Sequence, residues 1–306
     1  MLNRRGLGLA TASLAFAPAA RAQPAPEILA RYPNGTFLEN LAIRPDGSVL
    51  FTSYFARAVE AWSPAGGATR FATLDVHPVS LAATGDGGHA LAVHGTSFLA
   101  GPGAMRGQAA VLLLDAAGAV TRRIPLPEAI FPNGGLLLAP GRLLLADSAL
   151  GRVWEVDLAA GSARAWLDHP LLAPDPALPY PGVNGIKRQG DTLILSNSAT
   201  RQLLRLRLAG TAPQGVPETM ARMTGGVDDF DIAPDGTIYA ATHAEGLARL
   251  PPGAATPVMF PAPGLDGSTA VLLAPGQPAL YVLGTGGLSA GGRGEAALGR
   301  VALPPG

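Results

Sequence analysis

One short pattern recurs along the chain and constrains its fold more than any other feature. In the clearest copy, Gly225–His243, two adjacent carboxylates, Asp228 and Asp229, precede a Pro-Asp-Gly turn and an alternating strand. Proline fixes φ in the turn and the glycine after it accepts positive φ, so the chain reverses direction there. Each copy therefore predicts a β-hairpin with a polar residue at the start of its first strand.

The copies share one register. In six places, four clear and two weaker, thirteen residues separate a polar residue from the matching position of the next strand. The six polar residues, called repeat residues below, are Glu39, Ser80, Asn133, Asn184, Asp228 and Thr269. A fixed interval is typical of repeat architectures, in which each copy is one structural unit. The chain is therefore expected to form one repeat fold rather than two unrelated domains.

Each full unit continues into further short strands, which gives four strands a unit. The sixth unit lacks its outer strand, and a lone strand candidate, Glu27–Tyr32, precedes the first unit. We predict an all-β, six-bladed β-propeller over residues 23–306, with the last blade closed by this N-terminal strand. A β-helix or a pair of sandwiches is the alternative, but neither would explain the common register.

The first residues resemble an export signal. Arg4 and Arg5 precede an apolar run at about residues 6–17, and Ala20-Arg21-Ala22 provides a small-residue cleavage site. The run is too short to remain as a membrane-spanning helix. We therefore predict a signal peptide over residues 1–22 and a periplasmic or secreted protein that is not held in a membrane after cleavage. The Sec and twin-arginine routes both fit.

Composition excludes several classes of partner and site. The chain carries 22 basic and 22 acidic residues, and no basic cluster is longer than a pair, so nucleic acid is not an expected partner. It has no cysteine, which excludes disulfides and thiolate metal sites. Any metal must therefore bind oxygen or imidazole ligands. We expect a monomer or a weak oligomer.

The repeat residues predict a metal site. In a propeller the innermost strands start near the central axis, so their repeat residues converge there. Four of the six are strong oxygen donors: Glu39, Asn133, Asn184 and Asp228. Converging carboxylates without a nearby Lys or Arg are costly to bury unless a cation lies among them. One divalent ion is expected, Ca²⁺ first, with Mg²⁺, Mn²⁺ and Zn²⁺ as alternatives. The competing interpretation is that each residue only caps its own strand entry.

The chain resembles the senescence-marker-protein/gluconolactonase family, and more distantly the paraoxonase lactonases, in the segments FLENLAIRPDG, FPNGGLLLAPGRLLLADS, PGVNGIKRQGDTLILSNS and GGVDDFDIAPDGTIYAATH. The resemblance covers essentially all of the mature chain. It implies one catalytic divalent ion on the propeller axis, with Glu39, Asn184 and Asp228 as ligands. It implies Asn133 as a further ligand or a substrate contact. Asp229 matches a ligand of the paraoxonase-like branch only and is otherwise a candidate substrate contact.

Histidines provide the candidate general base. The run HPVSLAATGDGGHALAVHG resembles a paraoxonase segment with a histidine pair beside the metal, whose first member is proposed to activate water. His77 lies just before Ser80 and His94 ends the next strand, so a hairpin would bring them together at one rim. A neutral imidazole is a suitable base near neutral pH. Two unrelated rim histidines are the alternative. His243 ends a strand at the matching position and is a candidate substrate contact.

Two departures from the family pattern limit the resemblance. Asn40 and Gly134 stand where the paraoxonase branch uses acidic residues for a second calcium ion, so no second ion is expected. Sugar-lactone enzymes often hold substrate hydroxyls with an arginine, and only Arg188 and Arg201 are candidates for that role.

These features together predict a metal-dependent hydrolase that opens a small-molecule lactone or a related ester. A metal-polarised carbonyl would be attacked by a water deprotonated by His77, with His94 behind it, or by Asp228. Four aromatic residues favour a partly apolar substrate: Phe37, Phe131, Tyr180 and Phe230. The alternative function is a non-catalytic exported propeller that binds a ligand or a protein and holds a structural ion.

Overall fold

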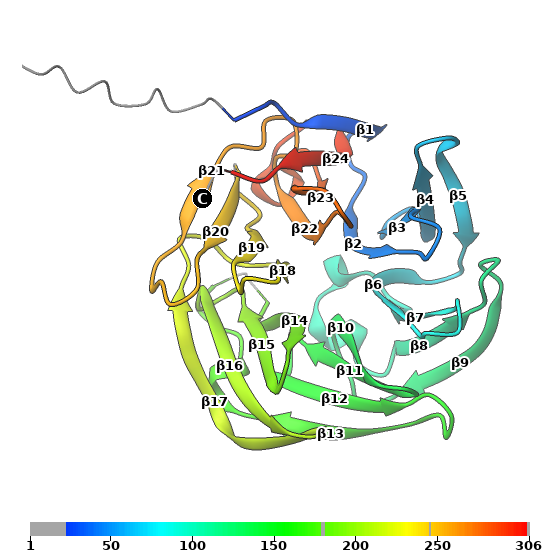
Figure 1. Ribbon diagram of the computed structural model, residues 1–306. Helices are drawn as coiled ribbons and strands as arrows, with labels where there is room; N and C mark the ends of the chain where they lie inside the picture. The colour runs from blue at the N-terminus through cyan, green and yellow to red at the C-terminus, as the bar shows by residue number, and fades with distance from the viewer. Residues whose placement is uncertain (1–22, 179–180, 245, 305–306) are drawn as a thin grey trace, which may run out of the picture.

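The computed structural model describes residues 23–178, 181–244 and 246–304. The predicted export signal and Tyr180 lie outside these residues. Six four-stranded antiparallel sheets surround a central axis, as predicted (Figure 1). The strands of the first three blades are β2 (Leu38–Ile43), β3 (Val49–Ser53), β4 (Ala58–Ser63), β5 (Gly67–Thr73), β6 (His77–Ala83), β7 (His89–His94), β8 (Ala109–Leu114), β9 (Val120–Leu126), β10 (Pro132–Ala139), β11 (Arg142–Asp147), β12 (Arg152–Asp157) and β13 (Ser162–Asp168). Those of the last three are β14 (Val183–Gln189), β15 (Thr192–Asn197), β16 (Gln202–Ala209), β17 (Ala212–Arg222), β18 (Phe230–Ile232), β19 (Ile238–Ala241), β20 (Leu247–Leu250), β21 (Val258–Phe260), β22 (Ser268–Leu273), β23 (Ala279–Gly284), β24 (Ala296–Ala302) and β1 (Glu27–Tyr32).

The N-terminal strand closes the ring. Strand β1 pairs with β24, so the sixth blade has the order β1-β24-β23-β22. An ion pair between Glu27 and Arg300 lies across this joint, with 2.5 Å between the carboxylate oxygen and the guanidinium nitrogen. The predicted closure of the last blade by Glu27–Tyr32 is confirmed.

The hydrophobic core lies between blades rather than within one blade. Six apolar clusters are each built from two neighbouring blades. Both faces of an inner strand are therefore covered, and every residue of β3 and of β7 is buried. Burial of both faces favours uninterrupted apolar strands, such as Leu143–Ala146 of β11, over a strict alternation.

A hydrogen bond to an equivalent carbonyl recurs at each contact between neighbouring blades. In all six blades the carbonyl just before the repeat residue accepts a hydrogen bond from the preceding blade, with donor–acceptor distances of 2.7–3.0 Å. The six donor–carbonyl pairs are Thr52–Val79, His94–Pro132, Ser148–Val183, Ser198–Val227, His243–Ser268 and Thr269–Leu38. Each repeat residue is thus placed at the same depth along the axis.

The glycines after the two repeat asparagines allow close approach of neighbouring blades. A Cβ on Gly134 would lie 2.1 Å from the carbonyl oxygen of Asn184. A Cβ on Gly185 would lie 2.9 Å from a carboxylate oxygen of Asp229. The Asn-Gly pairs therefore allow the inner strands to converge around the axis.

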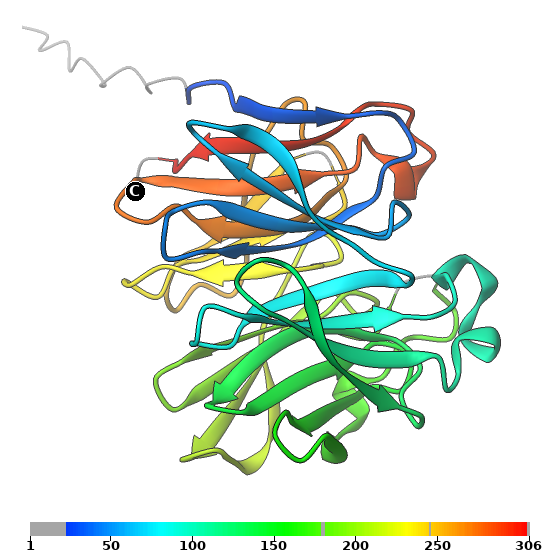
Figure 2. The same ribbon diagram turned by 90° about the vertical axis from the view of Figure 1, so that its right-hand side faces the viewer.

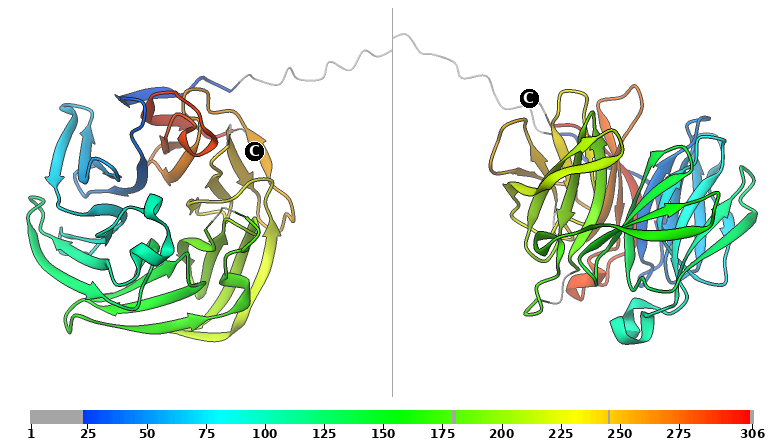
Figure 3. Two further views of the ribbon diagram at one scale, coloured as in Figure 1. Left: turned by 180° about the vertical axis from the view of Figure 1, so that it is seen from behind. Right: turned by 90° about the horizontal axis from the view of Figure 1, so that it is seen from below.

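Short helical turns lie in the long connections between strands: η1 (Phe98–Ala100), α1 (Pro102–Met105), η2 (Pro170–Leu172) and η3 (Leu288–Ala290). The loop with η1 and α1 and the loop with η3 project from the same face of the propeller (Figure 2, and Figure 3, right). Among the described residues, no helix has the length and apolar character needed to cross a membrane.

Candidate functional site

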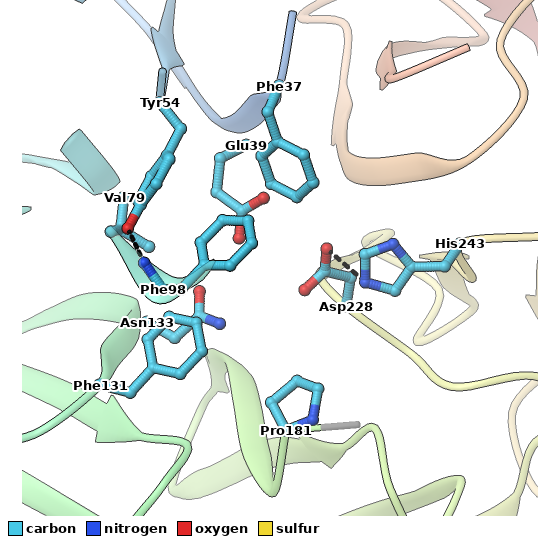
Figure 4. A pocket seen from close by; sticks show the side chains of 10 residues that line it. All are labelled: Phe37, Glu39, Tyr54, Val79, Phe98, Phe131, Asn133, Pro181, Asp228 and His243. Carbon is cyan, nitrogen blue, oxygen red and sulfur yellow. Dashed lines mark hydrogen bonds and ion pairs between the residues drawn. The ribbon is translucent and has the colours of Figure 1, made fainter. Parts of the chain in front are cut away.

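A cavity of about 260 Å³ lies where the inner strands meet the loop that carries η1 (Figure 4). Four of its lining residues are polar or charged: Glu39, Asn133, Asp228 and His243. The other six form an apolar wall: Phe37, Tyr54, Val79, Phe98, Phe131 and Pro181. The cavity therefore has one polar side and one largely aromatic side.

Glu39 enters the cavity from β2 and is only 8% exposed. Its Oε2 atom is buried and has no hydrogen-bond partner among the described residues. Burial, together with the charges of Asp228 and Asp229, raises the pKa of this carboxyl well above its usual range. Glu39 thus lacks the positive partner that a buried carboxylate ordinarily has.

Asp228 is held in the cavity by its backbone and its side chain (Figure 4). Its N–H donates to the carbonyl of Ala241 at 3.0 Å, and its own carbonyl accepts from the N–H of Gly185 at 2.9 Å. One carboxylate oxygen accepts from the Asn184 amide at 2.5 Å. The other lies 2.9 Å from Nε2 of His243. Asn184 thus lies against Asp228, and it is not among the lining residues of the cavity.

His243 is turned into the cavity by an unusual backbone conformation. Its φ is 56°, in the left-handed region that few residues other than glycine adopt. Its backbone N–H makes the joint to Ser268 of the next blade, which leaves the imidazole free to contact Asp228. Burial lowers the pKa of His243, but the charge and hydrogen bond of Asp228 outweigh burial, so the pKa is raised. Nε2 of His243 and the Asp228 carboxylate therefore lie within ion-pair distance of each other.

Asp229 is not a lining residue of this cavity. Its carboxylate contacts the Lys187 ammonium at 2.7 and 2.9 Å and accepts a hydrogen bond from the Asn40 amide at 3.2 Å. Burial raises the pKa of Asp229, while the charge of Lys187 opposes that rise. The premise that no Lys or Arg compensates the converging carboxylates concerned Glu39 and Asp228. Asp229 lies outside that set and is offset by Lys187, which extends from β14 to reach it.

His77 and His94 are direct partners across β6 and β7, as the hairpin argument predicted. Nε2–H of His94 donates to the Pro132 carbonyl at 3.0 Å, and its Nδ1 accepts from the Tyr54 hydroxyl at 3.1 Å. Burial lowers the pKa of His94 to about 3, so the ring is neutral. His77 donates from Nδ1 to the Tyr54 carbonyl at 3.1 Å. Neither histidine is among the lining residues of the cavity.

The aromatic wall is one connected cluster. The Phe98 ring lies 5.4 Å from that of Phe37, 4.7 Å from that of Tyr54 and 6.2 Å from that of Phe131, centroid to centroid. The Tyr54 hydroxyl accepts from the Phe98 N–H at 2.9 Å, and burial raises the pKa of this phenol to about 12. Tyr54 therefore links the η1 loop to His94 on β7.

Sequence reasoning missed four lining residues: Tyr54, Val79, Phe98 and Pro181. The signal for Phe98 was its place in the long connection at residues 95–108, and Pro181 similarly lies near the end of the proline-rich connection at 169–182. Of the aromatic candidates from the sequence, Phe37 and Phe131 line the cavity, whereas Phe230 is fully buried in the core between two blades.

No Lys or Arg is among the described residues that line the cavity. Arg188 donates to the backbone carbonyls of Gly190, Leu138 and Gly210, and Arg201 lies near the carbonyl of Thr224. Neither arginine is positioned to contact a ligand in this cavity.

The donor set suits a hard divalent cation. Within the part of the chain that the structure describes, no three His, Asp or Glu side chains form a metal-ligand group. The candidate set is instead two carboxylates, Glu39 and Asp228, with carboxamides nearby at Asn133 and Asn184. Oxygen-only donors and an unpaired buried carboxylate are the chemistry that Ca²⁺ and similar ions prefer.

Comparison with known proteins gives a structural likeness only. No family model matches the sequence, and no curated protein matches it. The solved structures with a similar fold include a gluconolactonase from Xanthomonas campestris, with a TM-score of 0.67, 15% identity, and coverage of 94% of this chain and 99% of that one. They also include regucalcin from Agrobacterium tumefaciens, titled a calcium-binding protein, with a TM-score of 0.63, 17% identity and coverage of 92% and 97%. A luciferin-regenerating enzyme has a TM-score of 0.67, 14% identity and coverage of 91% and 95%. The expected resemblance to propellers of the gluconolactonase type is thus confirmed for the fold.

Proposed function

We propose that this protein is a hydrolase that opens a lactone or a related carboxylic ester in the cavity. The observation that carries the proposal is the buried, unpartnered carboxylate of Glu39, which faces Asp228 and Asn133 across a cavity with an aromatic wall. The likeness to a gluconolactonase and to regucalcin supports it.

The proposal includes one divalent cation, Ca²⁺ in the first place and Mg²⁺, Mn²⁺ or Zn²⁺ as alternatives. Glu39, Asp228 and Asn133 would hold it at the cavity, and Asn184, which contacts Asp228, completes the set. When bound, such an ion supplies a Lewis acid that polarises the ester carbonyl. The charges of the chain fit this role: Lys187 offsets Asp229, whereas the Glu39 carboxylate has no positive partner among the described residues.

Asp228 and His243 together accept a proton from water and donate a proton to the leaving group. A water oxygen attacks the carbonyl carbon, and its proton passes to the Asp228–His243 pair. As the ester C–O bond breaks, the leaving oxygen takes a proton from the same pair. Both nitrogens of His94 are engaged and His77 does not line the cavity, so the proposal assigns the base to Asp228. His243 orients this carboxylate, and the aromatic wall keeps further water away from it.

With the predicted signal peptide over residues 1–22, the proposed reaction takes place in the periplasm or outside the cell. The substrate is a small molecule, and the working unit is a monomer or a weak oligomer.

The test is hydrolysis of a lactone panel by the mature chain, purified without chelator. The panel runs from glucono-δ-lactone through aliphatic γ- and δ-lactones to phenyl acetate, with and without added Ca²⁺, Mn²⁺ and Zn²⁺. Metal-dependent turnover of any member supports the proposal. The Glu39→Gln variant should lose both turnover and the rise in melting temperature that the metal gives. Glu60→Gln is the matched control, since Glu60 is equally buried but pairs with Arg70 away from the cavity.

Absence of turnover with every metal, together with tight ion binding by calorimetry, would favour the second candidate, a non-catalytic binding propeller with a structural ion. Turnover that is unchanged in Glu39→Gln would remove the cation from the proposal.

A further inference from the structure

A second cavity adjoins the candidate site and shares two residues with it. It encloses about 510 Å³ and is lined by Gly35, Phe37, Phe55, Phe98, Leu99 and Leu288. We call it the tail groove. Phe37 and Phe98 line both cavities. The tail groove therefore continues the aromatic wall of the site outward.

The tail groove is built by segments that are far apart in the sequence. Phe55 follows the inner hairpin of the first blade, Phe98 and Leu99 belong to η1, and Leu288 belongs to η3. The loops that carry η1 and η3 project from one face of the propeller (Figure 3, left). Phe55, Phe98 and Leu288 also pack on the buried cluster of Phe37, Tyr54 and Val79, so the groove has a firm floor.

Among the described residues, every side chain that lines the tail groove is apolar. Leu99 is 75% exposed and adds apolar surface to the lining of the groove. A sugar in this groove would find hydrogen-bond partners only on the backbone among the described lining residues, so burying its many hydroxyls there is unfavourable. The same surface favours a chain of methylene groups.

We infer that the tail groove binds an alkyl chain carried by the substrate, while the reacting carbonyl lies beside Glu39 and Asp228. The assignment of the carbonyl rests on the proposed function. The assignment of the alkyl chain rests on the groove itself, whose described lining side chains are apolar and which shares Phe37 and Phe98 with the site. The preferred substrates are therefore lactones with an alkyl substituent, in preference to polyhydroxylated sugar lactones.

The experiment has two arms. The first measures kcat/KM for δ-lactones that carry alkyl substituents of one to seven carbons, with glucono-δ-lactone for comparison. Each methylene that becomes buried should raise kcat/KM about fourfold at first, until the groove is filled. The second arm measures binding of hexan-1-ol, octan-1-ol and decan-1-ol by calorimetry, which needs no hydrolysis. Affinity should rise with chain length.

Two variants and a matched control test whether the alkyl chain of the substrate binds in the tail groove. Leu99→Asp places a charge at the edge of the groove, and Leu288→Ser removes part of its wall; each should flatten the dependence on chain length in both arms. Val216→Asp is the control, because Val216 is 63% exposed on β17, outside the groove. It should leave the dependence unchanged.

The outcomes separate the two proposals. If no lactone is hydrolysed but long alcohols still bind through Leu99 and Leu288, the proposed function fails and the groove assignment stands. If glucono-δ-lactone is preferred, or if chain length affects neither arm, the groove assignment is overturned while a hydrolase remains. An equal effect of Leu99→Asp and Val216→Asp would also overturn it.

Discussion

His94 ends β7 in the second blade and His243 lies just after β19 in the fifth, yet the two histidines serve different purposes. At the joint from the second blade to the third, the donor is the His94 imidazole itself, which bonds to the Pro132 carbonyl. At the joint from the fifth blade to the sixth, the donor is the backbone N–H of His243. The first ring is therefore fixed within the structure, and the second is free to contact Asp228 in the cavity.

The difference lies in the backbone, not in the residue type. A positive φ at His243 directs its N–H to Ser268 and its side chain to the cavity. The environments then separate the two pKa values, because burial lowers that of His94 to about 3, whereas Asp228 overcomes burial and raises that of His243. The two histidines lie one position apart in the repeat, 14 residues after Ser80 and 15 residues after Asp228, and the atom that bonds to the next blade decides what each ring does.

The largest expected effect is on kcat/KM, and it should differ between the repeat residues of the same two blades, Asp228 and Ser80. Asp228→Asn keeps the shape of the side chain but removes its charge, so kcat/KM for the best lactone should fall by about 10³-fold or more. Ser80→Ala in the second blade should change kcat/KM less than about threefold. Steady-state kinetics on both variants, with thermal unfolding to verify folding, makes the comparison. Comparable losses in the two variants would contradict a site centred on the fifth blade.

The second prediction exchanges each histidine for glutamine. His243→Gln should lower kcat about 10²-fold because Asp228 loses its orienting partner. The same variant should change the free energy of unfolding by less than about 1 kcal/mol.

His94→Gln should give the opposite result. It disturbs two buried hydrogen bonds, to Pro132 and from Tyr54, and should lower the free energy of unfolding by about 2 kcal/mol while kcat changes little. Urea unfolding and kinetics on the pair test both. If His94→Gln were the variant that lost turnover, the base would have to be reassigned to the His77–His94 pair.

The third prediction uses pH. The pKa of His94 is about 3 in the folded protein against an ordinary 6.5, so between these values the unfolded chain binds a proton that the folded chain does not. The stability that comes from His94 is complete above pH 6.5 and is lost as pH falls towards 3. Below pH 6.5 the wild type should lose up to about 1.4 kcal/mol per pH unit more than His94→Gln. Parallel stability curves for the two proteins would show that His94 is not held neutral.

The smallest expected effect is on stability and concerns the hydrogen bond between the third and fourth blades. Ser148 donates to the Val183 carbonyl at 2.7 Å, the same task that His94 performs in the second blade. Ser148→Ala should lower the free energy of unfolding by about 1 kcal/mol, without a change in the pH dependence of stability. A loss near zero would mean that this recurring hydrogen bond does not hold the blades in register.

The sequence predicted the architecture because its signals are local. Turn residues and short apolar strands repeat at one interval, and each copy folds into the same hairpin wherever it occurs. The six blades, their order and the closure by Glu27–Tyr32 follow from that interval. The convergence of Glu39, Asn133 and Asp228 on one cavity follows as well, because equivalent positions of a closed ring must face one axis.

Three features of the site depended on tertiary structure. The reach of Lys187 to Asp229 depends on the spacing between the fourth and fifth blades, and the aromatic wall depends on how the η1 loop folds back over Tyr54. The choice between His94 and His243 depends on which atom bonds to the next blade. The sequence alone thus determined the ring and the residues that face its axis, since these follow from local periodicity. Only the tertiary structure decided which side chains are free to act, because that depends on contacts between segments distant in sequence.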